Sequence, residues 1–111
     1  MIETTVQEYL QYKLGVIPVR MEREEGLPAK YVILEKTGSG EENQIRTATF
    51  AVQSYADSLY DAAALNEQII GFMEALPAER DIFACELNSD YNFTDTTFRK
   101  YRYQAVFDIV Y

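Results

Sequence analysis

A wide apolar stripe at helical spacing separates two groups of predicted strands and limits the folds open to this chain. Between residues 57 and 77, apolar side chains recur at three- and four-residue steps, and Leu65 and Phe72 widen the stripe. A stripe this wide is typical of a helix that lies flat on a sheet. Asp57 or Ser58 can cap the start of this helix, and Pro77 is expected to end it. Its members are Leu59, Ala62, Ala63, Asn66, Ile69, Ile70, Met73 and Leu76.

Three strands are predicted before this helix. Segment 17–22 contains Pro18, which favours an edge position because proline cannot donate to a strand ladder. Segment 31–37 is rich in β-branched and aromatic residues, and the glycine-rich segment 38–43 that follows predicts a turn. Segment 45–55 alternates between apolar and polar residues, which indicates a sheet covered on one side. Its apolar face is formed by Ala48, Phe50 and Val52.

Two strands are predicted after the long helix. Residues 82–87 form the first, with Phe83, Cys85 and Leu87 on the inward face. The polar stretch 88–98 then predicts a long connection, and 101–111 alternates as a final strand. A short helix is also expected near the N-terminus, because Thr4 or Thr5 can cap it and Gly15 can end it.

The predicted fold class is therefore α+β, in the order α-β-β-β-α-β-β. A mainly antiparallel sheet should carry the helices on one face. The 111 residues amount to one domain, residues 1–111, without room for a second core.

Composition narrows the function classes. The chain has 18 acidic and 10 basic residues and a formal net charge of −8, which argues against wrapping nucleic acid. Histidine is absent, so Ser-His and Cys-His nucleophile triads are excluded and the commonest metal ligand is missing. The single Cys85 excludes an internal disulfide framework and is expected to be a small buried apolar residue. No signal peptide or membrane-spanning segment is predicted, and we expect no enzyme, cofactor or metal site.

Three local patterns suggest chemistry, but a structural interpretation is favoured for each. The glycines of 38–40 are followed by a strand, whereas a phosphate-binding loop requires a helix N-terminus. Segment 90–95 has alternating oxygen ligands, yet Asp95 occupies the position where a calcium loop needs glycine. The paired carboxylates at 24–25 and 41–42 are adjacent in sequence and are expected to be a solvated acidic surface.

The many aromatic residues and one basic cluster are not explained by the patterns above. Nine Tyr and six Phe are many for a two-layer domain, and two of them, Tyr91 and Phe93, lie in the polar stretch 88–98. In the basic cluster 98–103, the rings at 101 and 103 fall on one face of the strand and the cations at 100 and 102 on the other. This predicts rings that face the core and cations that face outward and pair with the protein's own acids. The alternatives are binding of single-stranded nucleic acid and binding of a protein. The predicted partner contacts are Tyr91, Phe93, Arg99 and Arg102.

Four stretches carry a resemblance to a known family. They are YVILEKTGS at 31–39, AVQSYA at 51–56, LNSDYNFTD at 87–95 and YRYQAVFD at 101–108. Together with the order of elements, they resemble the tail terminator proteins of long-tailed bacteriophages and the related head–tail joining, neck or minor capsid proteins of prophages. The likeness spans nearly the whole chain, and the family offers no catalytic residue to transfer.

The resemblance implies a structural virion-assembly protein. Such a protein forms a ring, typically of six copies, that caps the tail tube and joins it to the head connector, in the virion and in the host cytoplasm during assembly. Strand edges would close the ring, and the loops at 22–30, 37–44 and 88–98 would meet partners above and below. An acidic wall would let DNA pass without specific binding. The alternative is a small non-enzymatic regulatory module that binds a ligand or a protein as a monomer or dimer.

Overall fold

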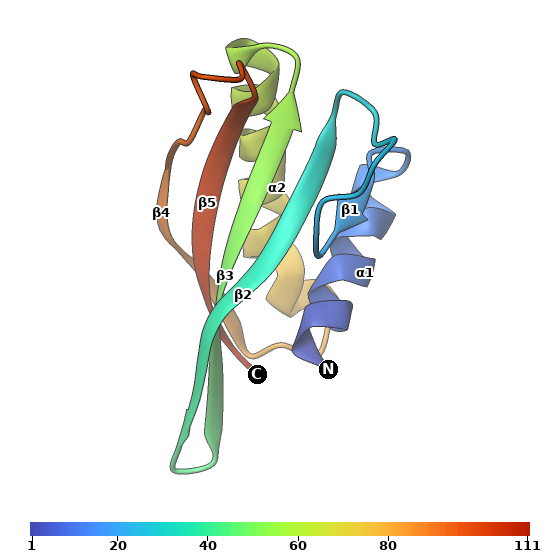
Figure 1. Ribbon diagram of the computed structural model, residues 1–111. Helices are drawn as coiled ribbons and strands as arrows, with labels where there is room; N and C mark the ends of the chain where they lie inside the picture. The colour runs from blue at the N-terminus through green and yellow to red at the C-terminus, as the bar shows by residue number, and fades with distance from the viewer.

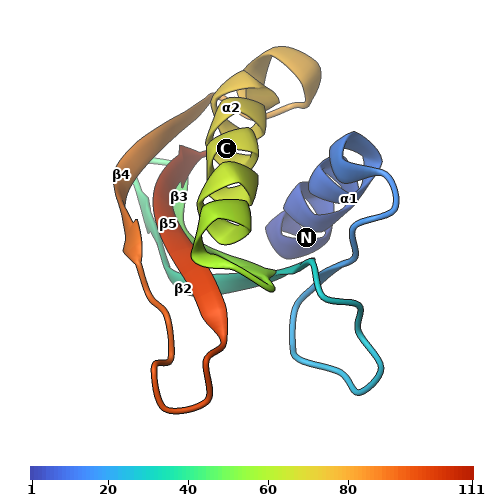
Figure 2. The same cartoon turned by 90° about the horizontal axis from the view of Figure 1, so that it is seen from above.

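The computed structural model describes residues 1–111 and confirms the predicted α+β class and element order. The five-stranded sheet has the order β1-β2-β3-β5-β4; β1 pairs with β2 in parallel and all other pairs are antiparallel. Both helices lie on the same face of the sheet, and the opposite face is open (Figures 1 and 2). The elements are α1 (Ile2–Leu14), β1 (Val19–Arg20), β2 (Tyr31–Glu42), β3 (Ile45–Ala56), α2 (Leu59–Glu79), β4 (Ala84–Asn92) and β5 (Tyr101–Val110).

The hydrophobic core lies between the sheet and the helices. Its centre is the cross-strand pair of Phe50 in β3 and Phe107 in β5, both fully buried. The predicted apolar face of β3 is confirmed, and Ala105 and Ile109 line the same side of β5. Neither helix is both long and apolar enough to cross a membrane.

Helix α2 supplies the largest share of the helical side of the core. The hydroxyl of Ser58 accepts a hydrogen bond from the backbone N–H of Asp61 at 3.1 Å, so the predicted cap is confirmed. The predicted end at Pro77 is wrong, because the helix continues to Glu79 with the proline inside it. Leu59 was expected in the stripe but is exposed, as the first residue of the helix.

Helix α1 is fastened to α2 through Tyr9. The Tyr9 hydroxyl donates to the carbonyl of Phe72 at 2.6 Å and contacts the carboxylate of Glu79, which pairs with Lys13 at 2.7 Å. Gly15 ends the helix with φ of 66°, as predicted.

The predicted capping of α1 by a threonine is wrong. The helix begins at Ile2, and Thr4 and Thr5 lie within its first turn. There their hydroxyls donate to the carbonyl of Met1, which is a local alternative to capping.

The buried Tyr9 hydroxyl and Cys85 thiol are neutral only while protonated, and this makes the stability of the fold sensitive to alkaline pH. Burial raises the pKa of Tyr9 to about 12, from 10.0, and that of Cys85 to about 12, from 9.0. Both groups lose their protons earlier in the unfolded chain, so stability should be intact below pH 9 and fall as the pH rises towards 12. Urea denaturation across this range should show that fall. In Cys85→Ala its onset should move from near pH 9 to near pH 10, whereas an unchanged onset would contradict the assignment.

Of the segment predicted as a turn, 38–43, residues 38–42 form a strand instead, and only Asn43 lies in a turn. Strand β2 continues to Glu42, with a register shift between Lys36 and Gly38, and pairs with β3 along its whole length. The turn consists of Asn43 and Gln44, whose φ angles are 52° and 67°. Both residues thus adopt the conformation of a two-residue hairpin. The result is a long hairpin that projects beyond the helices (Figure 1).

The region 82–98 also differs from expectation. Strand β4 runs through Asn92, so the first half of the predicted connection is a strand. A register shift between Leu87 and Ser89 changes the alternation, which turns Asp90 inward to accept a hydrogen bond from Asn66 of α2 at 3.0 Å. Of the three residues predicted to face inward, Cys85 is buried, but Leu87 and Phe83 are exposed. Phe83 lies beyond the end of α2, where no helix covers it.

Candidate functional site

Strand register places aromatic and polar side chains in two adjacent rows on the open face of the sheet. In the first row, Tyr31 pairs with Tyr55 and Tyr55 with Arg102, and the backbone N–H of Phe93 donates to the carbonyl of Arg102. The second row lies two residues further along each strand, on the same face. It consists of Ile33, Gln53, Gln104 and Tyr91. We call these eight residues the aromatic–arginine cluster.

Hydrogen bonds run through the cluster in one direction. Arg102 donates from Nη1 to the Tyr55 hydroxyl at 2.7 Å, and that hydroxyl donates to Gln53 at 3.1 Å. Gln53 donates to Gln104 at 2.9 Å, and Gln104 donates to the hydroxyl of Tyr91. Each donor in this chain is satisfied by the next acceptor, an arrangement that fixes side-chain orientations cooperatively. The chain ends at Tyr91, which is exposed and has a hydroxyl proton to offer a partner.

The rings of the cluster stack around the guanidinium of Arg102. Its central carbon lies 4.4 Å from the ring centroid of Phe93 and 5.6 Å from that of Tyr55. Tyr31 stacks on Tyr55 with centroids 4.5 Å apart, and Tyr91 meets Phe93 edge to face. Burial raises the pKa of Tyr31, so its hydroxyl stays protonated at neutral pH. The cluster is therefore a preformed, polar and aromatic surface on rigid strands.

The prediction that the cations of 98–103 pair with the protein's own acids is wrong. No carboxylate lies within 4.0 Å of the charged nitrogens of Arg99, Lys100 or Arg102; the four ion pairs of the chain use other cations. Arg102 is satisfied instead by a hydroxyl, by the carbonyl of Phe93 at 2.7 Å and by aromatic rings. In a chain with net charge −8, uncompensated cations at one end favour an acidic partner there.

Arg102 should be the residue of the cluster with the largest effect on stability. Arg102→Ala removes two hydrogen bonds and two ring contacts, so we expect the free energy of unfolding to fall by about 2 kcal/mol. Arg102→Lys should retain less than half of the stability that Arg102→Ala loses, because an ammonium group cannot reproduce the planar, forked hydrogen bonding of a guanidinium. The matched control is Arg99→Ala, which should change stability by less than about 0.5 kcal/mol. Urea denaturation measures all three, and equal values for Arg102→Ala and Arg99→Ala would contradict the assignment.

Of the four predicted contact residues, the structure brings Tyr91, Phe93 and Arg102 together. Arg99 is not part of the cluster: it has φ of 54° in the loop between β4 and β5. That loop is internally bonded, because Asp95 and Lys100 exchange two backbone hydrogen bonds at 3.1 Å and the Asp95 carboxylate accepts from the N–H of Thr97 at 3.0 Å. Of the oxygens considered as calcium ligands, that of Asp90 accepts a hydrogen bond from Asn66 of α2 and that of Asn92 accepts one from the N–H of Thr94, both at 3.0 Å. Its tip presents Phe98, whose side chain is 73% exposed.

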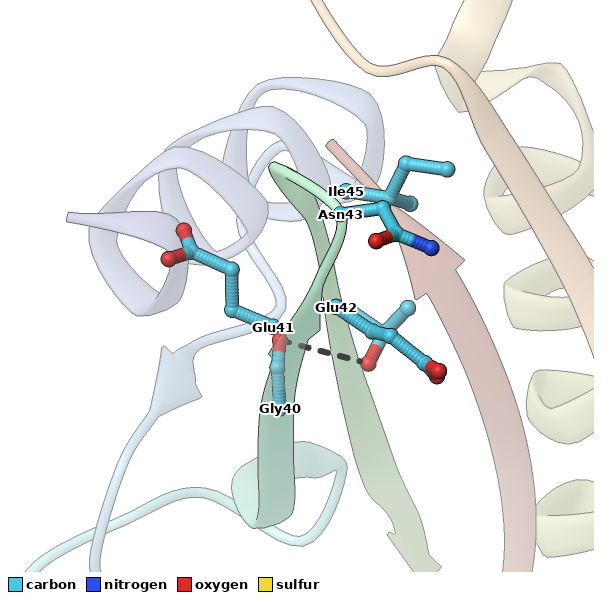
Figure 3. A pocket seen from close by; sticks show the side chains of 6 residues that line it. Gly40, Glu41, Glu42, Asn43 and Ile45 are labelled. Atoms are coloured by element: carbon cyan, nitrogen blue, oxygen red, sulfur yellow. Dashed lines mark hydrogen bonds between the residues drawn. The ribbon is translucent and has the colours of Figure 1, made fainter.

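The projecting hairpin of β2 and β3 is a second uncovered feature. Its end is hollowed between Gly40 and Thr47, and Figure 3 shows Glu41 and Ile45 pointing to opposite sides of the ribbon. Ile45 is 55% exposed although it is a large apolar residue. Arg46 follows Ile45 near the tip, and its guanidinium lies 4.7 Å from the ring centroid of Tyr111, whose backbone N–H donates to the Arg46 carbonyl at 2.9 Å.

A notch of about 650 Å³ lies between this hairpin and the connection from α2 to β4. Its apolar lining comes from both sides, and its most exposed member is Phe83, at 86%. Sequence reasoning missed this surface because it assigned Phe83 to the core. The end of the apolar stripe of α2 could have revealed this surface, because the length of the helix determines how much of the sheet is covered. The apolar lining residues are Ile45, Pro77, Ile82, Phe83, Val110 and Tyr111.

The described surfaces contain no group of three or more Cys, Asp or Glu side chains arranged to hold a metal ion. Cys85 is buried, and burial raises the pKa of its thiol to about 12, so at neutral pH the group is a protonated thiol. The features available for recognition are the aromatic–arginine cluster, the hairpin, the loop that carries Phe98, and the notch. No protein-family model matches this chain, and no curated protein matches it.

Proposed function

We propose that this protein is a structural phage assembly protein of the neck or tail-completion type, which forms a ring that caps the tail tube and joins it to the head. The proposal starts from the sequence resemblance, which four stretches between residues 31 and 108 carry. Each of those stretches contributes two of the eight residues of the aromatic–arginine cluster. A protein of this type acts by binding: its surfaces contact copies of itself, the tube protein and the connector protein.

The observation that carries the proposal is the projecting hairpin. Residues 39–47 are exposed along both strands, and the molecule measures 45 × 25 × 24 Å along its principal axes. Beyond Thr47, which pairs with Val110 at the end of β5, the hairpin has only two strands, and such a ribbon gains little stability by itself. A ribbon that ends in an exposed Ile45 is therefore best explained as an arm that a partner covers.

Sheet edges support a repeated contact between subunits. Strand β4 is an outer strand of the sheet, and β1 covers only the first residues of β2, so the rest of β2 also has an open edge. Open edges can pair with a neighbouring chain, and one heterologous contact repeated around an axis closes a ring. The net charge of −8 would keep DNA from adhering to the wall of such a ring.

Co-assembly with a tail tube tests the proposal. The chain is mixed with polymerising tail-tube protein encoded beside it, and the products are imaged by negative-stain electron microscopy. We expect a ring at one end of each tube and tubes that stop growing once capped. Tubes that elongate without limit and carry no cap would overturn the proposal. A chain that stays monomeric, ignores tubes and binds another protein would favour the regulatory alternative.

A further inference from the structure

We propose that neighbouring copies join head to tail, with Phe98 of one copy seated in the notch of the next. The proposal rests on the ring function above and names the contact that would build the ring. Two surfaces of complementary chemistry, an exposed ring beside cations and an apolar notch beside acids, lie at opposite ends of one chain. The loop that carries Phe98 lies at one end of the long axis, and the hairpin and the C-terminal residue lie at the other (Figure 1).

The first surface is a protruding apolar side chain followed by two cations. Phe98 is 73% exposed at the tip of a loop that its own hydrogen bonds hold in shape. Arg99 and Lys100 follow it, and neither has a carboxylate within ion-pair distance. An exposed ring beside unpaired cations on a preformed loop is a typical anchor for a concave apolar site with an acidic border.

The second surface has those properties. The notch of about 650 Å³ is lined by five hydrophobic residues and Pro77, with Phe83 and Ile45 the most exposed. Asp81 lies on its border, and Glu42 is the cross-strand neighbour of Ile45 on the same face of the hairpin; neither acid forms an ion pair. Two cations lie nearby. Arg80 contacts the carbonyl of Glu79 at 2.8 Å and the ring of Tyr9. Arg46 stacks on the ring of Tyr111 and pairs with Glu41 at 3.9 Å.

The geometry determines the symmetry of this contact. A copy cannot place Phe98 in its own notch, because the two lie at opposite ends of a molecule 45 Å long. In a twofold dimer, each copy would have to insert its own Phe98 into the notch of the other copy, so both contacts would have to form at once. In a head-to-tail contact, one copy contributes Phe98 and the next contributes the notch. Such a contact repeats from copy to copy and closes as a ring when the rotation allows it. One anchored ring buries about 150–250 Å², so a single contact should be weak and closure should strengthen it.

Two variants test the contact by complementation. Phe98→Ser removes the anchor and leaves the notch, and Phe83→Ser removes the notch lining and leaves the anchor. Sedimentation equilibrium should show concentration-dependent association of the unmodified chain, at least tenfold weaker in either variant. An equimolar mixture of the two should stop at a heterodimer, because only one productive contact remains. The matched control is Tyr60→Ser, which removes an 82% exposed ring from α2 and should associate like the unmodified chain.

Several results would overturn the head-to-tail contact. They are a monomeric unmodified chain up to millimolar concentration, variants that still associate normally, or a mixture that stays monomeric. Thermal denaturation shows whether each variant is folded, since both substitutions are at exposed positions and should leave the transition unchanged. The tube-capping assay separates the two proposals. If Phe98→Ser still caps tubes, this contact is wrong and the ring function stands; if the unmodified chain neither associates nor caps tubes, both are wrong.

Discussion

Replacing Phe107 by alanine is expected to lower the free energy of unfolding by about 3–5 kcal/mol, the largest effect of any single substitution considered for this chain. Phe107 is fully buried at the centre of β5, opposite Phe50 of β3 and beside Leu87 of β4. Its removal leaves a cavity between three strands and α2 that the sheet cannot close. Since domains of this size are stable by about 5–15 kcal/mol, this loss removes a large fraction of the total stability.

The control for this prediction is another phenylalanine of the same chain. Phe98→Ala removes the same atoms from an exposed position and should change the free energy of unfolding by less than about 0.5 kcal/mol. Urea denaturation followed by circular dichroism measures both. Similar losses for the two variants would mean that the helices do not cover the sheet in the way described.

Shortening the hairpin should abolish assembly and leave the domain folded. Replacing Glu41–Arg46 by Asn-Gly keeps Gly40 opposite Thr47, so the register of the remaining strands is preserved, and Asn-Gly suits a two-residue turn. The removed residues are all exposed, so the loss of stability should be about 1 kcal/mol or less. Capping of tail tubes should fall below detection, because the arm and one wall of the notch are gone.

The matched control for the hairpin exchanges its turn without shortening it. Asn43→Asp and Gln44→Gly together keep the length and favour the same positive φ angles. This variant should cap tubes like the unmodified chain. Tubes capped equally well by the shortened variant would show that the hairpin has no part in assembly.

The sequence was sufficient for the elements whose residues face the core. The alternation of Ala48, Phe50 and Val52 placed β3 correctly, and the stripe of α2 placed the long helix on the sheet. Both patterns arise because burial selects one face of a strand or helix. The predicted class and order of elements followed from these segments alone.

The sequence was insufficient where the chain leaves the core. Strand β2 continues through Gly38 and Gly40 because β3 pairs with it, and this long-range pairing overrides the turn propensity of glycine. The register shift after Leu87 reversed the alternation in β4, which hid the strand. Phe83 was assigned to the core because alternation indicates which face a side chain takes, and only the end of α2 determines whether that face is covered.

The candidate site was predicted in part for the same reason. Tyr91, Phe93 and Arg102 were selected as unexplained aromatic and basic residues, and strand register brings them together. Their neighbours Tyr31, Tyr55 and the two glutamines come from strands distant in sequence, so only the pairing of β2, β3 and β5 identifies them as members. The partner role of these residues stays a prediction.

Deletion of the coding sequence from the genome that carries it is the most direct test of the proposed assembly function. Particles released after phage induction are imaged by electron microscopy, with and without the unmodified protein supplied in trans. We predict filled heads and separate tail tubes of irregular length in the deletion, and joined virions with uniform tails on complementation. Normal, infectious virions in the absence of the protein would contradict the account, as would a genome that releases no phage particles at all.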